Sequence, residues 1–263
     1  MVQGKEKSLK INMILNAIKG IMSIVFPLIS FPYVSKILGV ENIGRYNFSN
    51  SIISYVVLFA GLGISTYAIR EGARLRNYKE KIEKFSNEMF SINVLSTIVA
   101  YIGLLILLML VPKFHEYTSL LIILSLQVIF KTIGIEWIYS IYEDYAYITI
   151  RSIIFQALSL ILLFLLVKTQ NDVNKYAAIT VLSSVGSNVM NYVHARKYCK
   201  VSLTTKIDWK KHIKPIMVLF AMSLTVTLYV SSDTTMLGIM CDDYTVGIYS
   251  VSTKIYSIVK TIL

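Results

Sequence analysis

Residues 134–152, GIEWIYSIYEDYAYITIRS, are the part of the sequence on which the interpretation of the whole chain depends. They contain the acidic residues Glu136, Glu143 and Asp144 and the basic residue Arg151, and long apolar runs lie on both sides. Charged side chains within or against such runs are costly to place in lipid and are functional candidates by default. The stretch predicts two membrane helices that are joined by a turn at Glu143 and Asp144.

The composition predicts a protein with several membrane-spanning helices. The 263 residues are 55% hydrophobic and 16% charged, whereas about 25% of the residues in a soluble domain are charged. Several apolar runs approach or exceed the ~20 residues that cross a bilayer. No cleavage site of small residues follows the first run, so we expect a membrane helix there rather than a removable signal peptide.

The net charge of +11 is explained by the placement of basic residues in loops. Lysines and arginines accumulate in the cytoplasmic loops of membrane proteins. With the N-terminus inside, the cytoplasmic segments hold seventeen basic residues and the external turns hold five. This asymmetry predicts a multi-pass protein of the cell membrane with a cytoplasmic N-terminus, and it gives no reason to expect nucleic-acid binding.

The apolar runs predict an all-α polytopic membrane protein of about eight transmembrane helices. The expected helices are 11–34, 46–69, 88–111, 119–141, 148–167, 176–193, 215–237 and a last one from about 246. Pro27 and Pro32 are expected to kink or end the first helix. Between the second and third helices, residues 70–84 hold six basic and three acidic residues, with apolar residues at helical spacing. That pattern is typical of an amphipathic helix on the cytoplasmic surface.

Two short segments of the chain resemble each other. IGRYNFSNSIIS at 43–54 aligns with VGIYSVSTKIYS at 246–257, which places Gly44 on Gly247. The offset is 203 residues, or six predicted helices, so both copies enter the membrane in the same direction. Parallel repeats of this kind build transporters from two lobes. The alternative is chance similarity, because Gly, Ser, Tyr and Ile are common in membrane helices.

The repeat predicts how the chain is divided. Residues 1–200 are expected to form an N-terminal lobe of six helices, and residues 201–263 to begin a second lobe with two helices. A six-helix period implies a transporter of about twelve or more helices. We therefore expect this chain to be a fragment, or the product of a truncated coding frame. Transport sites lie between lobes, so one wall of the site would be missing.

A row of polar residues follows one face of the first predicted helix. Asn16, Lys19 and Ser23 are spaced by three and four residues, which places them on the same helical face. A polar stripe on a membrane helix faces protein or water rather than lipid. Arg45 opens the second helix at its outer side, where it could meet a phosphate group or extend to the membrane interface.

The most deeply placed charges are expected in the fourth helix. Lys131 lies ten residues from its cytoplasmic end, or roughly 15 Å deep at 1.5 Å per residue. A lysine at such a depth costs roughly 2.5–3.5 kcal/mol. Glu136 lies roughly 140° around the helix from Lys131, so the two side chains are not expected to pair with each other. Each side chain either lines a cavity or pairs with a neighbouring helix. In the seventh helix, Asp233 has no obvious partner and is a candidate proton or cation site.

Several kinds of site are not expected. Cys199 and Cys241 are predicted on opposite sides of the membrane, which excludes a disulfide between them. The three histidines fall in different loops, so neither a metal site nor a cofactor is expected. The sequence contains no phosphate-binding loop of the G-x-x-x-x-G-K-[ST] type. With no hydrophilic segment longer than about twenty residues, no soluble catalytic domain fits and the chain is not expected to be an enzyme.

Residues 134–152, together with FPYVSKILGVENIGRY at 31–46, resemble the Wzx-type polysaccharide repeat-unit flippases. These belong to the multidrug/oligosaccharidyl-lipid/polysaccharide exporter superfamily. The resemblance implies two parallel lobes around a cationic cavity. It also implies transfer of an undecaprenyl-diphosphate-linked oligosaccharide to the outer leaflet for O-antigen or capsule synthesis, together with other polysaccharide assembly proteins. The chain departs from the family in length, since half the expected helices are present.

On this resemblance the polar stripe and the deep charges become candidates for binding the substrate. The residues are Asn16, Lys19, Ser23, Arg45, Lys131 and Glu136, with Asp233 as a possible coupling-ion site. Two other functions remain open. One is a cation-coupled exporter of drugs or lipid precursors from the same superfamily. The other is a membrane scaffold of a polysaccharide synthesis complex that transports nothing.

Overall fold

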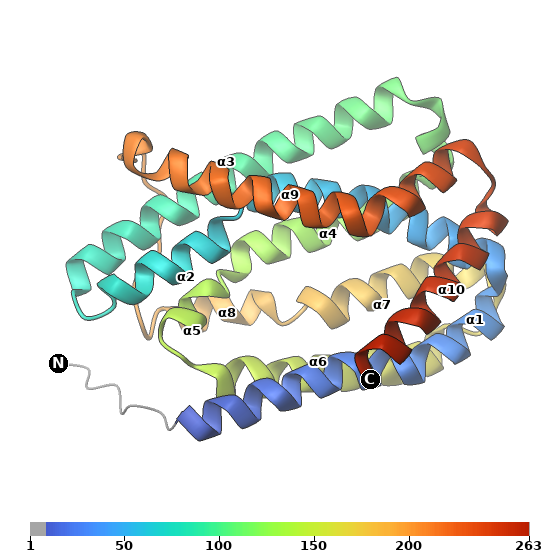
Figure 1. Cartoon of the computed structure of the whole chain (residues 1–263), viewed down its shortest axis with the longest axis horizontal. Helices are drawn as coiled ribbons and strands as arrows, with labels where there is room; N and C mark the ends of the chain where they lie inside the picture. The colour runs from blue at the N-terminus through green and yellow to red at the C-terminus, as the bar shows by residue number, and fades with distance from the viewer. Residues whose placement is uncertain (1–8, 263) are drawn as a thin grey trace.

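The computed structural model describes residues 9–262, and within that range every regular element is a helix (Figure 1). The elements are α1 (Leu9–Gly61), α2 (Ile64–Leu75), α3 (Lys79–Leu110), η1 (Pro112–Tyr117), α4 (Thr118–Gly134), α5 (Trp137–Ile141), α6 (Tyr145–Leu166), η2 (Gln170–Asp172), α7 (Val173–Val185), α8 (Asn188–Ala195), α9 (Trp209–Met240) and α10 (Asp243–Ile262). The side chains of residues 9–13, 15, 16, 19, 23, 24 and 258–262 are outside the described part. The predicted all-α class is confirmed.

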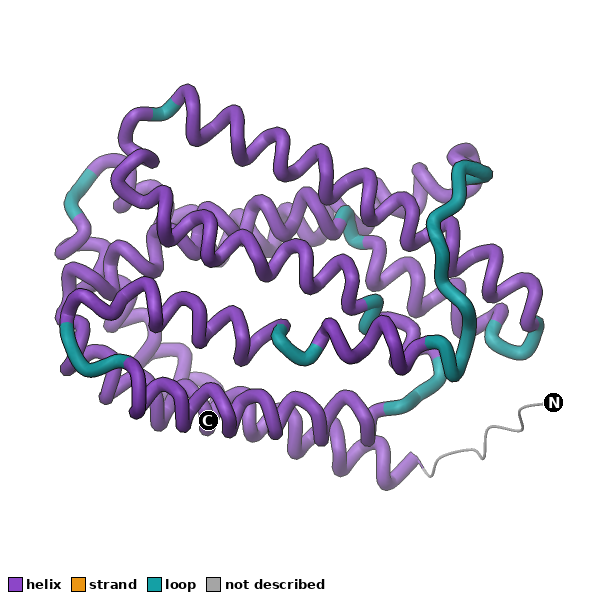
Figure 2. The backbone as a smooth tube through the Cα atoms, turned by 180° about the vertical axis from the view of Figure 1, so that it is seen from behind, coloured by secondary structure: helices purple, strands orange, loops and turns teal. Residues whose placement is uncertain are grey.

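The helices run back and forth between two ends of one bundle (Figure 1). We call the end at which α1 begins the proximal end. It also holds the turns 76–78 and 142–144 and the loop 196–208. Figure 2 shows this loop as the longest non-helical segment, at the same end as the start of α1. The opposite, distal end holds Gly39, η1, η2 and the turn before α10. The predicted turn at 142–144 is therefore present.

Within the part of the chain that the structure describes, five stretches are long and apolar enough to cross a membrane, compared with eight predicted helices. They are Gly20–Leu75, Lys79–Leu110, Pro112–Gly134, Tyr145–Leu166 and Trp209–Met240. The first covers two predicted helices, because α1 bends at Gly39. The last predicted helix corresponds to α10, which is not among these five stretches.

Gly39 alone makes the turn between the helices that were predicted at 11–34 and 46–69. Its φ of 75° and ψ of 169° are non-helical, a conformation that glycine adopts without the steric cost of a Cβ. Helical geometry continues to Leu38 and resumes at Val40. The prediction that the first helix ends near residue 34 is therefore wrong, and Pro27 and Pro32 both lie inside α1.

Two predicted helices are each broken in two. The helix predicted at 119–141 ends at Gly134, because Ile135 has a φ of 36°, and α5 follows separately. The helix predicted at 176–193 is interrupted between α7 and α8. The breaks pack together, since a Cβ on Gly134 would lie 2.6 Å from the Asn188 Cγ. Irregular backbone within a membrane is tolerated where protein encloses it, and Ile135 and Asn188 are buried.

The basic segment 70–84 is not one amphipathic surface helix, so that prediction is wrong. A turn at 76–78 divides it between α2 and α3. Tyr67 and Ala68 of α2 are buried, and α2 packs against α3 and α5. Ile82 of α3 enters the same apolar cluster, which also contains Ile216 of α9. The segment is therefore part of the proximal core, with its basic residues exposed around it.

Candidate functional site

Two cavities of about 290 Å³ each open beside α4. The inner cavity lies among α1, α4, α6 and α7 and is lined by Phe26, Pro27, Tyr46, Asn50, Leu124, Gln127, Gln156, Thr180, Val181, Ser183 and Ser184. The outer cavity lies among α1, α4 and α9 and is lined by Ser54, Val57, Gln127, Val226, Thr227, Val230 and Ser231. Gln127 lines both, so the two cavities meet at its side chain. Among the described residues, no charged side chain lines either cavity.

Lys131 lies one helical turn beyond Gln127 on α4. Leu124, Gln127 and Lys131 are separated by three and four residues, the spacing that aligns side chains on one helix face. The Lys131 side chain is exposed and forms no ion pair with any described residue. The neighbouring Thr132, in contrast, is buried and shares a hydrogen bond of 2.7 Å with Thr97. The predicted depth of Lys131 assumed an unbroken helix to residue 141, and that assumption is wrong.

Glu136 forms an ion pair with Arg151, the buried cation of α6. An Arg151 Nη2 donates to the Glu136 Oε1 at 3.3 Å, and the Arg151 side chain is only 7% exposed. A charge at that depth needs a carboxylate close by, which gives Glu136 a structural role beside the α4–α5 break. Arg151 is nearly two turns into α6, away from the turn that holds Glu143 and Asp144.

The two acidic residues of the turn have other partners. Arg76 donates to the Glu143 Oε1 at 2.7 Å, and the Tyr198 hydroxyl donates to the Asp144 Oδ2 at 2.5 Å. Burial and the nearby Asp144 carboxylate raise the pKa of Tyr198 well above its ordinary value. Tyr142 stacks on Tyr198 with ring centroids 4.6 Å apart. The tyrosines and acidic residues of 134–152 therefore help to hold the proximal end together.

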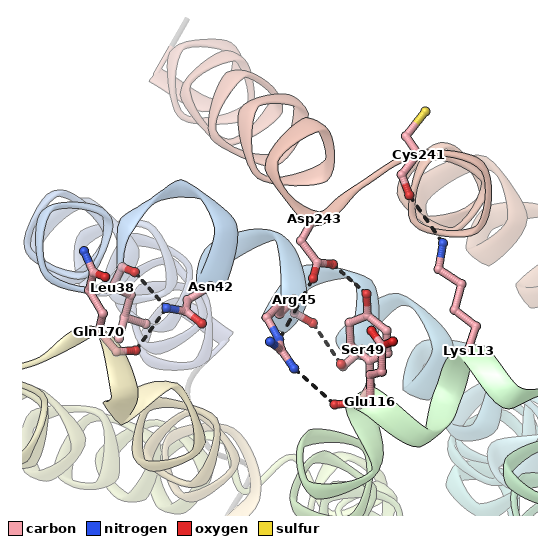
Figure 3. A network of polar contacts seen from close by, with 10 residues as sticks. Leu38, Asn42, Arg45, Ser49, Lys113, Glu116, Gln170, Cys241 and Asp243 are labelled. Atoms are coloured by element: carbon pink, nitrogen blue, oxygen red, sulfur yellow. Dashed lines mark hydrogen bonds and ion pairs between the residues drawn. The ribbon is translucent and has the colours of Figure 1, made fainter.

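Arg45 belongs to a polar network at the distal end (Figure 3). It donates to the Glu116 carbonyl at 3.1 Å, and its Nε lies 4.0 Å from the Asp243 Oδ2. Tyr117 donates to the other carboxylate oxygen of Asp243 at 2.7 Å. Lys113 donates to the backbone carbonyls of Ile239 and Cys241 at 2.9 and 3.3 Å. We call Arg45, Lys113, Tyr117 and Asp243 the distal clasp, because they tie α1 and η1 to the α9–α10 turn.

The remaining predicted site residues lie elsewhere. The side chains of Asn16, Lys19 and Ser23 are outside the described part of the structure, although their backbone is helical. Asp233 accepts a hydrogen bond of 2.7 Å from Tyr249, so it has a partner that the sequence did not reveal. The fold thus separates Arg45 at the distal end from Glu136 beside the α4–α5 break.

A buried hydrogen-bonded chain, which the sequence did not reveal, joins three helices. The Tyr67 hydroxyl lies 2.9 Å from the His212 Nδ1, and the His212 Nε2 lies 2.8 Å from the Glu88 Oε2. His212 is fully buried and Glu88 is 4% exposed. His212 was expected in a loop, but α9 begins at Trp209 and carries it into the core. Within residues 9–262, no cluster of three His, Cys, Asp or Glu side chains could hold a metal ion.

Gln127 and Gln156 were also missed as cavity residues. The only signal in the sequence is an amide side chain within an apolar run, and in membrane helices such residues often form hydrogen bonds between helices. Among the described residues, the buried Gln156 Oε1 has no hydrogen-bond partner. Neither periodicity nor spacing distinguishes an amide that bonds to a neighbouring helix from one that faces a cavity.

Comparison with known proteins places this helical bundle in a family. A family model described as "Polysaccharide biosynthesis protein" matches residues 9–263. The chain is 24% identical over 166 residues to a protein of Escherichia coli (strain K12) described as "Putative O-antigen transporter". The match covers 63% of this chain and 40% of that relative, so this chain spans less than half of the relative's length. No solved structure matches. The chain is therefore a membrane protein that belongs to the polysaccharide biosynthesis protein family.

Proposed function

We propose that this chain is part of a flippase that moves a lipid-diphosphate-linked oligosaccharide across the cell membrane. The proposal is supported by the family and by the related O-antigen transporter. The observation that carries it is Lys131, an exposed cation with no carboxylate partner among the described residues, one turn from two uncharged cavities. The oligosaccharide repeat unit would pass as a whole, without any bond being made or broken.

Lys131 has the properties that a passing diphosphate requires. Lys131 lies in the last turn of α4 with its side chain exposed, so its ammonium group is accessible to an anion. Two other cations among the described residues already have partners, since Arg151 has Glu136, and Arg45 has Asp243 and a carbonyl oxygen. An ammonium group is a compact charge on a flexible stem. It therefore attracts a diphosphate without requiring one fixed orientation of the phosphate oxygens.

Two features support the arrangement of the chain as one lobe, residues 1–200, and the start of a second, residues 201–263. The first segment of α1 and α9 both run from the proximal to the distal end (Figure 1). Gly44 and Gly247, matched in the sequence repeat, are also matched in their contacts, as described in the Discussion. In this proposal the lobes face each other across α1, α9 and α10. Asp233 and the polar stripe at Asn16, Lys19 and Ser23 would then belong to the region between them.

The proposed orientation places the proximal end in the cytoplasm. The basic segments 70–84 and 194–214 both lie at this end, and positive charge accumulates on the cytoplasmic side. The substrate would therefore enter near the α4–α5 break and leave past the distal clasp.

The proposal is tested by replacing Lys131 in the chromosomal gene of the strain that carries it. Lys131→Ala should lower surface polysaccharide about tenfold or more, since an interaction with a charged group contributes about 1.5–3 kcal/mol. Lipid-linked oligosaccharide should accumulate on the cytoplasmic side, while the amount of protein in the membrane stays normal. The matched control is Lys168→Ala, an exposed lysine in the loop before η2. Normal surface polysaccharide with Lys131→Ala would contradict the proposal.

A further inference from the structure

We infer that the fold contains a hinge at which the proximal part of the bundle bends as one unit. The bending part, which we call the proximal module, consists of α2, α5, α8 and the adjoining ends of α3 and α9. The inference adds a moving part to the transport function proposed above. It is tested without a substrate, so its failure would leave that function untouched.

The buried apolar residues form two separate cores along the length of the bundle. The distal core contains Phe48 and Leu121, and the proximal core contains Tyr67 and Trp137. In three places the chain passes from the distal core to the proximal one, between Ala60 and Ile64, between Val128 and Ile135, and between Val185 and Ala195. A helix break lies in each of these intervals. The close packing that makes a protein interior stiff is therefore interrupted where the helices are interrupted.

Buried or partly buried polar side chains occupy the level between the two cores. We call Asn93, Ser96, Thr97, Thr132 and Asn188 the polar belt. Asn93 and Ser96 of α3 donate to the Ala60 carbonyl beside the first break, at 2.8 and 2.5 Å. Thr97 shares a hydrogen bond of 2.7 Å with Thr132 of α4. Asn188, at the start of α8, lies against Gly134 at the end of α4. The belt thus joins the three breaks at one level of the bundle.

The backbone at two of the breaks has a conformation typical of switch points. Leu62 and Ile135 have φ angles of 44° and 36°, which are unfavourable for residues with a side chain, above all a β-branched one. Residues held in this way cluster at sites that change conformation. The unbroken helix α3 also bends more easily at this level, because the Thr97 hydroxyl donates to the Asn93 carbonyl at 2.7 Å.

The base of α9 is fastened to the proximal module. The fully buried His212 bonds to Tyr67 of α2 and to Glu88 of α3. Farther along, α9 passes the level of the first break, where a Cβ on Gly63 would lie 2.9 Å from the backbone of Leu219. Both α3 and α9 continue past the belt, so the two parts of the bundle bend against each other rather than separate.

The hinge lies beside the outer cavity. The residues that line this cavity from α1 and α4, Ser54, Val57 and Gln127, all precede the breaks that follow in the chain and therefore lie on the distal side of the belt. The wall from α9 belongs to a helix whose base is held by the proximal module. Bending at the belt therefore changes the width of the outer cavity toward the proximal end, where the proposed substrate would enter.

The hinge is tested by measuring distances between pairs of spin labels on the purified full chain, with both cysteines replaced by alanine. The labelled positions are exposed, with Ala73 and Lys210 at the proximal end and Glu116 and Lys168 at the distal end. Ala73 with Lys210, and Glu116 with Lys168, should each give a narrow distance distribution. Ala73 with Glu116, which spans the belt, should give a wider distribution or two distances. A distribution for this third pair as narrow as the other two would overturn the inference.

A wide distribution for Ala73 with Lys210 would also overturn the inference. It would show that α9 moves against α2, as expected if two rigid lobes rock against each other, and that no proximal module bends as a unit.

A double variant tests whether the polar belt is the hinge. Thr97→Val with Thr132→Val removes both partners of a buried hydrogen bond and keeps their shape, a change that folds tolerate. It also joins the two apolar cores across the belt. The distances from Ala73 to Glu116 should then narrow to the width of the other two pairs, whereas the control Thr118→Val at the distal end should leave them wide. An unchanged width in the double variant would overturn the assignment of the hinge to the belt. If the double variant does not fold, the three distances in the chain with an intact belt still decide the inference.

Discussion

Gly44 of α1 and Gly247 of α10 lie at the crossing of their two helices, and each faces the backbone of the other helix. A Cβ on Gly44 would overlap the carbonyl oxygen of Asp243, and a Cβ on Gly247 would overlap that of Val40. The contacts are reciprocal, because Val40 and Asp243 each precede the glycine of their own helix by four residues. Such reciprocity is what a two-fold relation between equivalent surfaces would produce. It joins the two segments that the sequence repeat aligned.

The first prediction concerns this crossing. Gly44→Ala should lower the free energy of unfolding by about 1–3 kcal/mol, the usual cost of overpacking, because the backbones must separate. The matched control is Gly103→Ala in α3, where an added Cβ would meet nothing within 4 Å. That variant should be neutral or slightly stabilising, since alanine is the better helix former. Thermal unfolding in detergent measures both, and equal stability of the two variants would count against the tight crossing.

The second prediction ranks two members of the distal clasp. Tyr117→Phe should cost about 1.5–3 kcal/mol, because a buried hydroxyl then no longer donates to the Asp243 carboxylate. Arg45→Ala should cost less than about 1 kcal/mol, because Arg45 is partly exposed and lies 4.0 Å from that carboxylate. Denaturant unfolding of the single and double variants gives both values. The reverse ranking would show that the ion pair, rather than the tyrosine, stabilises the distal end.

A third prediction tests the buried Tyr67–His212–Glu88 chain. His212→Ala should destabilise the protein by about 3–5 kcal/mol, because the buried Glu88 carboxylate would lose its partner. Replacing His212 and Glu88 together with leucine should restore much of this loss. His115→Ala is the matched control, since His115 is exposed at the distal end. A small effect of His212→Ala, similar to that of the control, would mean that Glu88 is compensated in another way.

The fourth prediction distinguishes the two cysteines, which lie at opposite ends of the bundle. Cys199 is buried, and burial raises the pKa of its thiol, so less of the reactive thiolate is present at neutral pH. Cys241 is exposed. A membrane-impermeant maleimide should therefore label Cys241 of intact cells and leave Cys199 unlabelled until the protein is unfolded. Labelling of Cys241 only after the cells are lysed would contradict a cytoplasmic proximal end.

The sequence predicted the helices better than their interruptions. Apolar runs revealed the helical class, and the turn at 142–144 followed from two adjacent acidic residues. The breaks after Gly134 and Val185 could not be predicted in this way. A glycine in a membrane helix usually marks close packing, and only the contact of Gly134 with Asn188 shows why the chain is interrupted there.

The sequence likewise predicted only part of the candidate site. Lys131 attracted attention because a charge in an apolar run is costly. The partner of Arg151, in contrast, depends on which helix lies opposite, and that is a property of the fold. Gln127 and Gln156 carry no charge, so nothing in the sequence indicates that they line cavities.

The central claim is that the charge of Lys131 attracts a lipid diphosphate, and a series of charges at this position tests it most directly. The measurement is the equilibrium affinity of the purified chain for undecaprenyl diphosphate, with Lys131 unmodified and replaced by Arg, Ala or Glu. Arg should retain most of the affinity, Ala should lose about tenfold or more, and Glu should lose still more. The same series at Lys168 should have no effect. Equal affinity of all four chains at position 131 would contradict the account.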